Sequence, residues 1–322
     1  MGKIQPTGEQ AMIIAPTTGI EVFNLHQHQP GIQRFLASFA LSPERPSLQA
    51  LQKIIAAFSH LPYENLSKII KFNQYQENQL ARLRLPEEVI EDHLRLHTGG
   101  TCFSLTFFLQ CILLHRGFSC YIVMGDMKAG RNVHCALIVT LDEIKYLVDP
   151  GYVLHRPMAL DPARPRLYHT ELNGVELRCD PRLPAYDLYT FTRADMKWRY
   201  RLQDRATPED EFLSHWQASF HRNSMHGLCL TRVHEHELIF ILKDFMRVTS
   251  FAGKRNVNLK HSLPRTINEV FGIAPEYVEQ ALSALRENLA HERRADNDSC
   301  QRSQAIRSSN PAQNSENLFS NG

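Results

Sequence analysis

Apolar residues recur at helical spacing early in the chain. Between residues 48 and 58 they lie three or four positions apart, as on the buried face of an amphipathic helix, at Leu48, Leu51, Ile55 and Phe58. Ser47 directly precedes this run and is a typical N-cap residue. The pattern predicts a helix that begins after Ser47.

Three further helices are predicted before residue 118. Pro62 in LPYENLSKIIKF and Pro86 in LPEEVIEDHLRL mark two helix starts, because proline fits the first turn of a helix. The apolar run after Cys102 indicates a third, buried helix, which Gly117 ends. This part of the chain is therefore expected to be helical.

The pattern then changes to short runs rich in β-branched and aromatic residues. FSCYIVMGDM, NVHCALIVTL and IKYLVDPGY follow one another with turn residues between them, and predict consecutive antiparallel strands in a small sheet or barrel. Prolines and charged residues between about 155 and 200 indicate short strands and loops, with GVELRCD as one strand.

The last third mixes both patterns. A helix is predicted in TPEDEFLSHWQASFH, a strand pair or a single strand-like run in HELIFILKDFMRVT and a final helix in APEYVEQALSALRENL. The Ser-, Asn- and Gln-rich end is expected to be disordered. The expected organisation is an extension over 1–22, a helical domain over 23–117, a β-barrel domain over 118–204, an α/β lid over 205–290 and a disordered tail over 291–322.

Composition narrows the classes of protein. The 322 residues hold 36 Lys and Arg against 34 Asp and Glu, so a net charge of +2 gives no reason to expect nucleic acid or an anionic membrane as partner. The longest apolar run, FSLTFFLQCILL, is shorter than the roughly 20 residues that cross a bilayer. Seven cysteines without a CxxC pair, and no apparent signal segment, favour a reducing, cytoplasmic setting.

Cys102 is a candidate nucleophile because of its position. It follows two glycines in TGGTCFSLTFFLQ and directly precedes the predicted buried helix. Unpaired N–H groups and the positive end of the helix dipole both favour a thiolate there. Taken alone, Cys102 is more simply a small core residue, as most free cysteines are.

The predicted strands supply a base and a carboxylate. If the hairpin turns between Leu141 and Asp142, His134 lies directly opposite Asp149, within reach of a hydrogen bond. A turn shifted by one residue would break this opposition. Each residue alone has a structural explanation, but the two together satisfy each other's polar groups among apolar neighbours.

These residues occur within recognisable motifs. PYENL at 62–66, GGTCF at 99–103, His134 in an apolar strand and LVDPGY at 147–152 together resemble the arylamine N-acetyltransferase family. The resemblance implies an α+β fold of helical bundle, antiparallel β-barrel and α/β lid with a cysteine-protease-like core. It also implies that Cys102 is the nucleophile, His134 its base and Asp149 the carboxylate that orients the base.

The resemblance further implies the substrates. The donor would be acetyl-CoA as a co-substrate, the acceptor a small-molecule amine, and no cofactor would be bound permanently. In the family the coenzyme approaches the loop after the aspartate, which here is Gly151, Tyr152 and Val153. The expected activity is a ping-pong acyl transfer through acyl-Cys102.

Four positions depart from the family pattern. The family's Arg, Glu, Asn and second Gly are replaced by Thr98, Ser104, Thr106 and Val153. Charged support for the nucleophile loop is therefore expected to be missing, and Glu64 needs a partner such as Arg95 or His97, or stays solvated. A β-branched residue at 153 predicts weak coenzyme A binding.

Two other functions stay open. One is an amide synthase or thiol hydrolase that keeps the same three residues but uses another acyl donor, and the other is a binding protein without catalysis.

The HEH sequence at 234–236 lacks a third ligand at recognisable spacing, so no metal site is predicted. Cys111 lies on the opposite side of the predicted helix from Cys102 and is expected to face the core.

Overall fold

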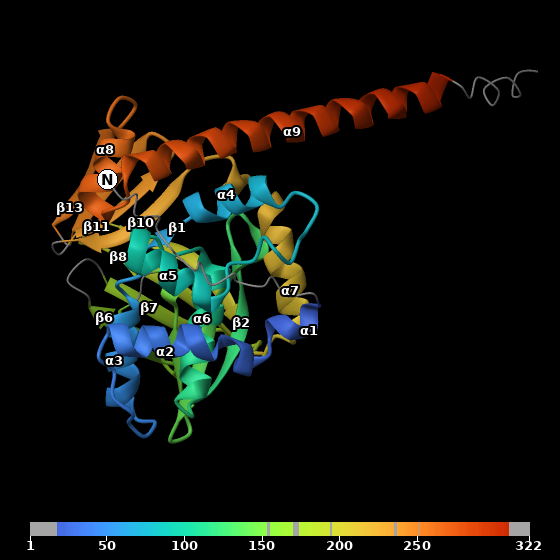
Figure 1. Ribbon diagram of the computed structural model, residues 1–322. Helices are drawn as coiled ribbons and strands as arrows, with labels where there is room; N and C mark the ends of the chain where they lie inside the picture. The colour runs from blue at the N-terminus through green and yellow to red at the C-terminus, as the bar shows by residue number, and fades with distance from the viewer. Residues whose placement is uncertain are drawn as a thin grey trace, which may run out of the picture.

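The N-terminal part of the chain is built from helices. The computed structural model describes residues 18–152, 155–169, 174–193, 195–234, 237–250 and 252–308. Its first elements are α1 (Gly19–Val22), η1 (Leu25–His28), α2 (Gln29–Ser38), α3 (Leu48–Phe58), β1 (Tyr63–Glu64), α4 (Leu66–Gln74), α5 (Pro86–Leu96) and α6 (Cys102–His115) (Figure 1).

The predicted cap of α3 is confirmed. The Ser47 hydroxyl accepts a hydrogen bond from the Ala50 N–H at 3.1 Å, and α3 begins at the next residue. The start at Pro86 is also confirmed. The start at Pro62 is wrong, because Tyr63 and Glu64 form β1 and the helix begins only at Leu66.

Helix α6 is the centre of the helical part. Every residue from Cys102 to Leu113 is buried except Gln110, so this helix is surrounded by protein on all sides. Gly117, at φ 79°, follows the end of α6 in the left-handed region that glycine adopts without strain. The helix therefore holds its first residue, Cys102, at a defined place inside the molecule.

An eight-stranded antiparallel sheet follows α6. Its strands are β2 (Ser119–Met127), β3 (Gly130–Leu141), β4 (Ile144–Val148), β5 (Met158–Ala159), β6 (Arg166–His169), β7 (Gly174–Cys179), β8 (Ala185–Phe191) and β9 (Met196–Gln203). Their order is β5-β4-β3-β2-β9-β8-β7-β6. The Tyr168 hydroxyl on β6 donates to the Ala159 carbonyl on β5 at 2.9 Å, so a side chain links the two outer strands of a nearly closed barrel.

Strand β3 is buried on both faces. Cys135, Leu137 and Val139 pack into the apolar core around α6. Ala136 and Ile138, on the opposite face, pack inside the barrel. Side chains alternate along a strand, so β3 separates the two cores and belongs to both.

The predicted register of the β3–β4 hairpin is wrong by two residues. Leu141 pairs with Ile144 and Val139 with Tyr146, so the turn is Asp142–Glu143. Both turn residues have positive φ, 47° and 65°, as a two-residue hairpin loop of the favoured type requires. A shift by two keeps every side chain on its predicted face.

A second sheet combines distant parts of the chain. It has the order β1-β10-β11-β12-β13, with β10 (Cys229–His234), β11 (Glu237–Leu242), β12 (Phe245–Ser250) and β13 (Gly253–Asn258). The strand pair predicted in HELIFILKDFMRVT is confirmed as β11 and β12. Tyr63 of β1 pairs with Thr231 of β10, which joins the N-terminal part to the C-terminal sheet.

The remaining elements are helical. They are η2 (Pro150–Tyr152), α7 (Glu209–Ala218), η3 (Ser219–His221), η4 (Asn223–Met225), α8 (Leu263–Phe271) and α9 (Pro275–Ser308). Helix α9 packs on α4 by its first turns and then extends away from the body (Figure 1). Residues 291–308, predicted to be disordered, are therefore helical; no Gly or Pro interrupts the sequence between Pro275 and Ser308.

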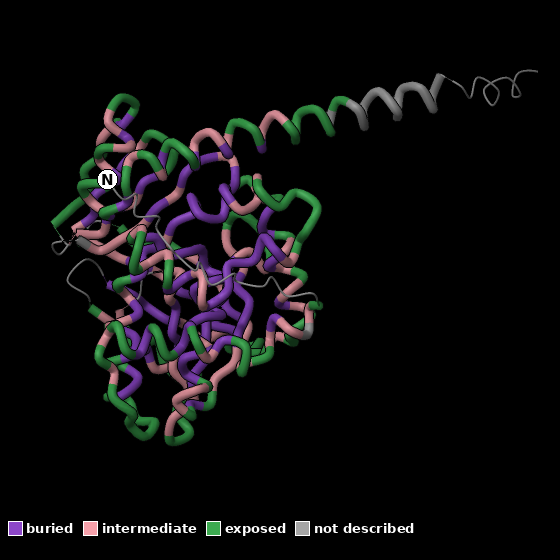
Figure 2. Tube along the Cα trace, viewed as in Figure 1, coloured by how far each residue is buried: buried purple, intermediate pink, exposed green. Residues whose placement is uncertain are grey.

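Burial is concentrated between the helices and the two sheets, while the loops at the ends are exposed (Figure 2). Two apolar cores account for this, one around α6 and one inside the barrel. Among the described helices, none combines the length and apolar character that a membrane span requires.

Candidate active site

Cys102 is the first residue of α6. Thr101, in extended conformation, is the N-cap, and the thiol lies where the first turn of the helix has unpaired N–H groups. Both glycines before it are closely packed, and at Gly99 the neighbour is backbone, which cannot move aside. A Cβ at Gly99 would lie 2.0 Å from the Pro62 carbonyl oxygen, and one at Gly100 would lie 2.3 Å from Ser104 Oγ.

His134 and Asp149 are in direct contact. His134 Nε2 lies 2.7 Å from Asp149 Oδ2, and both side chains are buried. In the observed register the β3–β4 ladder ends at the pair of Leu137 and Val148, so His134 and Asp149 lie beyond it and are not directly opposed, and Asp149 connects β4 to η2. The predicted contact is thus present although the predicted pairing is not.

Asp149 is held by two more donors. The Tyr200 hydroxyl on β9 donates to Oδ2 at 2.5 Å, and the Tyr152 N–H donates to Oδ1 at 2.9 Å. The Tyr200 ring also packs against the His134 ring, with centroids 4.7 Å apart. These contacts leave the carboxylate one orientation, so the imidazole is oriented as well.

The turn after Asp149 packs against the thiol. A Cβ at Gly151 would lie 2.6 Å from Cys102 Cβ and 3.3 Å from His134 Cε1, so only glycine leaves room for both side chains. The Tyr152 ring lies edge-on to His134, with centroids 6.4 Å apart. Val153, the third residue of the predicted coenzyme loop, lies outside the described residues.

The pKa values of Cys102 and His134 are displaced in opposite directions. Hydrogen bonds from Cys135 and His134, with the charges of His134 and Lys68, hold the pKa of Cys102 well below its ordinary value in spite of burial. Burial alone would lower the pKa of His134, but the charge of Asp149 and the hydrogen bond to it raise that pKa to about 10. The favoured state is a thiolate beside an imidazolium.

The other described cysteines differ from Cys102. Burial raises the pKa of four thiols, those of Cys111, Cys120, Cys135 and Cys229. Cys111 is buried in the core around α6, as expected from its place on the helix. Within the described residues, Cys102 alone has a resolved lowering of its thiol pKa.

Two cationic side chains lie near the thiol. Lys68 is buried, donates to the Ser219 carbonyl and hydroxyl at 3.1 and 2.6 Å, and has its pKa lowered by burial to about 7. Arg222 donates to the Asn132 carbonyl at 3.0 Å, and its guanidinium carbon lies 5.9 Å from the centre of the Phe103 ring. Lys68 in its charged form stabilises a thiolate at Cys102.

Comparison with known proteins decides the family. A family model described as N-acetyltransferase matches residues 47–277, well over half of the chain. The chain belongs to the arylamine N-acetyltransferase family. It is accordingly an enzyme, as the sequence motifs indicated.

Solved arylamine N-acetyltransferases share the fold. The enzyme of Mycobacterium abscessus has a TM-score of 0.67 at 16% identity, with 79% of this chain and 94% of that one covered. The Nocardia farcinica enzyme has a TM-score of 0.66 at 19% identity, with 83% and 98% covered. The Mycobacterium marinum enzyme in complex with CoA has a TM-score of 0.62 at 18% identity, with 79% and 96% covered. The search of curated proteins found no match.

Three residues of the candidate site were not predicted from the sequence of this arylamine N-acetyltransferase family member: Tyr200, Lys68 and Cys135. Tyr200 had a usable signal, because MKWRYRLQ alternates apolar with charged or polar residues as a half-buried strand does. Lys68 and Cys135 had none, since nothing local shows that they lie near Cys102. In the described part of the chain, no group of three or more His, Cys, Asp or Glu side chains could hold a metal ion.

Proposed function

We propose that Cys102, His134 and Asp149 form the catalytic triad of an acyltransferase that works by a ping-pong cycle. The observation that carries the proposal is the buried His134, which contacts Asp149 and has a raised pKa while the pKa of Cys102 is lowered. Such a pair presents an activated thiolate at neutral pH, as in cysteine-protease-like active sites.

In the first half-reaction the Cys102 thiolate attacks the carbonyl carbon of an acyl thioester. The acyl–sulfur bond to the donor breaks, the donor's sulfur takes the proton of His134, and acyl-Cys102 remains. In the second half-reaction an amine attacks acyl-Cys102, neutral His134 accepts the amine proton, and the Cys102 thiolate is released beside an imidazolium. Asp149 orients the imidazole throughout.

Acetyl-CoA is the proposed donor and a small amine the acceptor. Family membership and the relative in complex with CoA support this assignment. Gly151 lets the turn after Asp149 pack directly against Cys102 and His134, which keeps the nucleophile and its base together for attack on a thioester. Val153, in place of the family's second glycine, favours weak coenzyme binding and keeps another acyl donor as the second candidate.

Intact-protein mass spectrometry tests the proposal. The protein is incubated with acetyl-CoA, a simple acetyl thioester or p-nitrophenyl acetate, and then with an arylamine. We expect one acetyl group on Cys102 that the amine removes, none on Cys102→Ser, and normal labelling of Cys111→Ser. Acetylation only by the simple donors would favour the second candidate, and no acetylation by any donor would contradict acyl transfer.

A further inference from the structure

In the loop before Cys102, residues 98–101, each backbone carbonyl has its own hydrogen-bonding partner. His93 Nδ1 lies 3.0 Å from the Thr98 carbonyl, and the Glu64 N–H donates to the Gly100 carbonyl at 3.0 Å. The Thr101 carbonyl accepts from Leu105 N at 3.0 Å and from Ser104 Oγ at 3.1 Å. The remaining carbonyl, of buried Gly99, accepts a hydrogen bond from Arg84 Nη2 at 3.1 Å.

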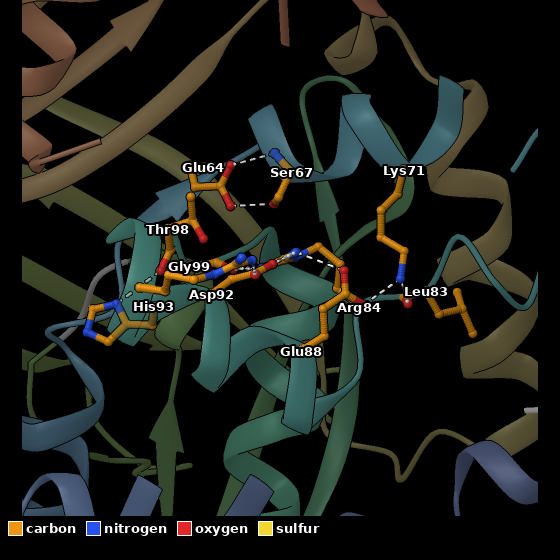
Figure 3. A network of polar contacts seen from close by, with 11 residues as sticks. Glu64, Ser67, Lys71, Leu83, Arg84, Glu88, Asp92, His93, Thr98 and Gly99 are labelled. Carbon is orange, nitrogen blue, oxygen red and sulfur yellow. Dashed lines mark hydrogen bonds and ion pairs between the residues drawn. The ribbon is translucent and has the colours of Figure 1, made fainter. Parts of the chain in front are cut away.

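The Arg84 side chain is buried and is held in place by two carboxylates. Its side chain is 4% exposed, and Nη1 donates to Glu88 Oε1 at 3.0 Å and to Asp92 Oδ2 at 2.8 Å (Figure 3). Both carboxylates belong to α5 and lie one turn apart, so they fix the guanidinium plane while Nη2 points to the loop. Arg84 therefore connects α5 to the segment that positions Cys102.

Three carboxylates stabilise the positive charge of Arg84. Burial lowers its pKa, but Glu88, Glu64 and Asp92 raise that pKa more, and the net direction is upward. Glu64 is fully buried and accepts from Ser67 N at 3.0 Å and Ser67 Oγ at 2.5 Å. Glu64 is thus neither solvated nor hydrogen-bonded to Arg95 or His97 within the described residues, because Ser67 supplies its donors and the mostly exposed Arg95 pairs with Asp92.

Position 98 contributes no such support. Thr98 is buried, and its hydroxyl oxygen has no hydrogen-bond partner within the described part of the chain. The motif as read from sequence lacked a cation for the nucleophile loop, whereas the folded chain brings one from 15 residues away. The expectation that charged support is missing is therefore wrong.

We infer that Arg84 is a positioning residue for the proposed acyl transfer, which holds the Gly99–Gly100 segment so that Cys102 faces His134. The inference rests on the proposed function for its activity readout only. A planar guanidinium donates to two carboxylates and a carbonyl in fixed directions, which an ammonium group on a flexible stem cannot reproduce. Loss of Arg84 should free the Gly99 carbonyl and let the start of α6 shift.

Arg84→Gln and Arg84→Lys test this against a matched control. Lys71 is also largely buried, pairs with the same Glu88 and donates to the Leu83 carbonyl, but makes none of the loop contacts. Lys71→Gln should therefore disturb the same network without touching Gly99. Hydrogen–deuterium exchange of the peptide covering 98–103 reports on the loop, and the pH profile of Cys102 alkylation by iodoacetamide reports on the thiol.

In both Arg84 variants we expect faster exchange in 98–103 and slower alkylation at neutral pH. We also expect kcat/KM to fall by about 10- to 100-fold, as for reacting groups misplaced by about 1 Å. Lys71→Gln should leave exchange and alkylation unchanged. If Arg84→Gln fails to fold, Arg84→Lys, which keeps the charge, carries the test.

Two results would overturn the inference: unchanged exchange in 98–103 in the folded Arg84 variants, or an equal increase in Lys71→Gln. Failure of the proposed function looks different. In that case wild-type Cys102 would take up no acyl group from any donor, while the exchange difference between the Arg84 and Lys71 variants would persist.

Discussion

Replacing Asp149 by asparagine should switch off the thiolate at Cys102 while keeping the shape of the site. The amide is nearly the same size as the carboxylate and still offers an oxygen to Tyr152 N–H or the Tyr200 hydroxyl. It removes the negative charge that keeps His134 protonated. Burial then lowers the pKa of His134, and the neutral thiol and imidazole become the favoured pair.

The size of the effect follows from the structure. The rise in the pKa of His134 from 6.5 to about 10 corresponds to about 5 kcal/mol in favour of the imidazolium, at about 1.4 kcal/mol for each pKa unit. Without it, a thiol with the ordinary pKa of 9.0 is about 1% ionised at pH 7. Alkylation of Cys102 at pH 7 should therefore slow by up to about 100-fold, because only the thiolate reacts, and by less to the extent that the Cys135 hydrogen bond and Lys68 still lower the thiol pKa.

The assay is the rate of Cys102 alkylation by iodoacetamide between pH 5 and 10, followed by peptide mapping. Wild type should react at a nearly constant rate from pH 6 to 8, and Asp149→Asn at a rate that rises about tenfold per pH unit, as the thiolate fraction does below the thiol pKa. Asp187→Asn is the matched control, because Asp187 pairs with Arg201 on the barrel. Superimposable profiles for wild type and Asp149→Asn would refute the reasoning.

The same substitution can be made in a His134→Ala background. If Asp149 acts through the imidazole, Asp149→Asn should have almost no further effect in the His134→Ala background on the rate of Cys102 alkylation or of acyl transfer. Losses that simply add in kcal/mol would show that the two residues act independently.

The pair also predicts how stability depends on pH. Stability from protonated His134 is present below pH 6.5 and lost as the pH rises through about 10. Stability from the Cys102 thiolate is present above the ordinary pKa of 9.0 and lost as the pH falls through its lowered pKa. Between pH 6.5 and 9.0 the two trends cancel, so the free energy of unfolding in urea should be nearly constant there and should fall as the pH rises from 9.0 through about 10; a steady slope between pH 6.5 and 9.0 would contradict the pair.

Three further substitutions give distinct outcomes. Gly151→Ala should reduce the rate of Cys102 acylation by more than about 100-fold, because the new Cβ would lie 2.6 Å from Cys102 Cβ. The control is Gly253→Ala, where a Cβ has no atom within 4 Å and the rate should not change. Equal acylation rates in the two variants would contradict the packing argument. Lys68→Met should slow alkylation at pH 6 by about threefold, since a positive charge near the thiolate is lost, and an unchanged rate would exclude that charge as a cause. Val153→Gly should speed acylation by acetyl-CoA about tenfold but not by p-nitrophenyl acetate, because glycine allows closer approach of the coenzyme; parallel changes with both donors would argue against a coenzyme effect.

Much of the site could be predicted from local sequence because its signals are local. The helix that begins at Cys102 follows from two glycines before an apolar run, and the strands that carry His134 and precede Asp149 follow from their β-branched residues. The predicted contact between His134 and Asp149 is present although the predicted register was wrong by two residues, because a shift by an even number of residues keeps both side chains on the same face of the sheet.

Other features depended on contacts between distant segments, which a local pattern does not encode. Tyr63 pairs with Thr231 to form the edge of the C-terminal sheet, so the stretch after Pro62 is a strand although its composition suits a helix. The Arg84 contact with Gly99 and the position of Lys68 near Cys102 arise because α4, α5 and the nucleophile loop pack together. Hydrophobic periodicity in the sequence determines which face of a helix or strand is buried. Only tertiary packing decides which buried polar groups meet, because each buried donor or acceptor needs a hydrogen-bond partner and bonds to the one that the fold brings within reach.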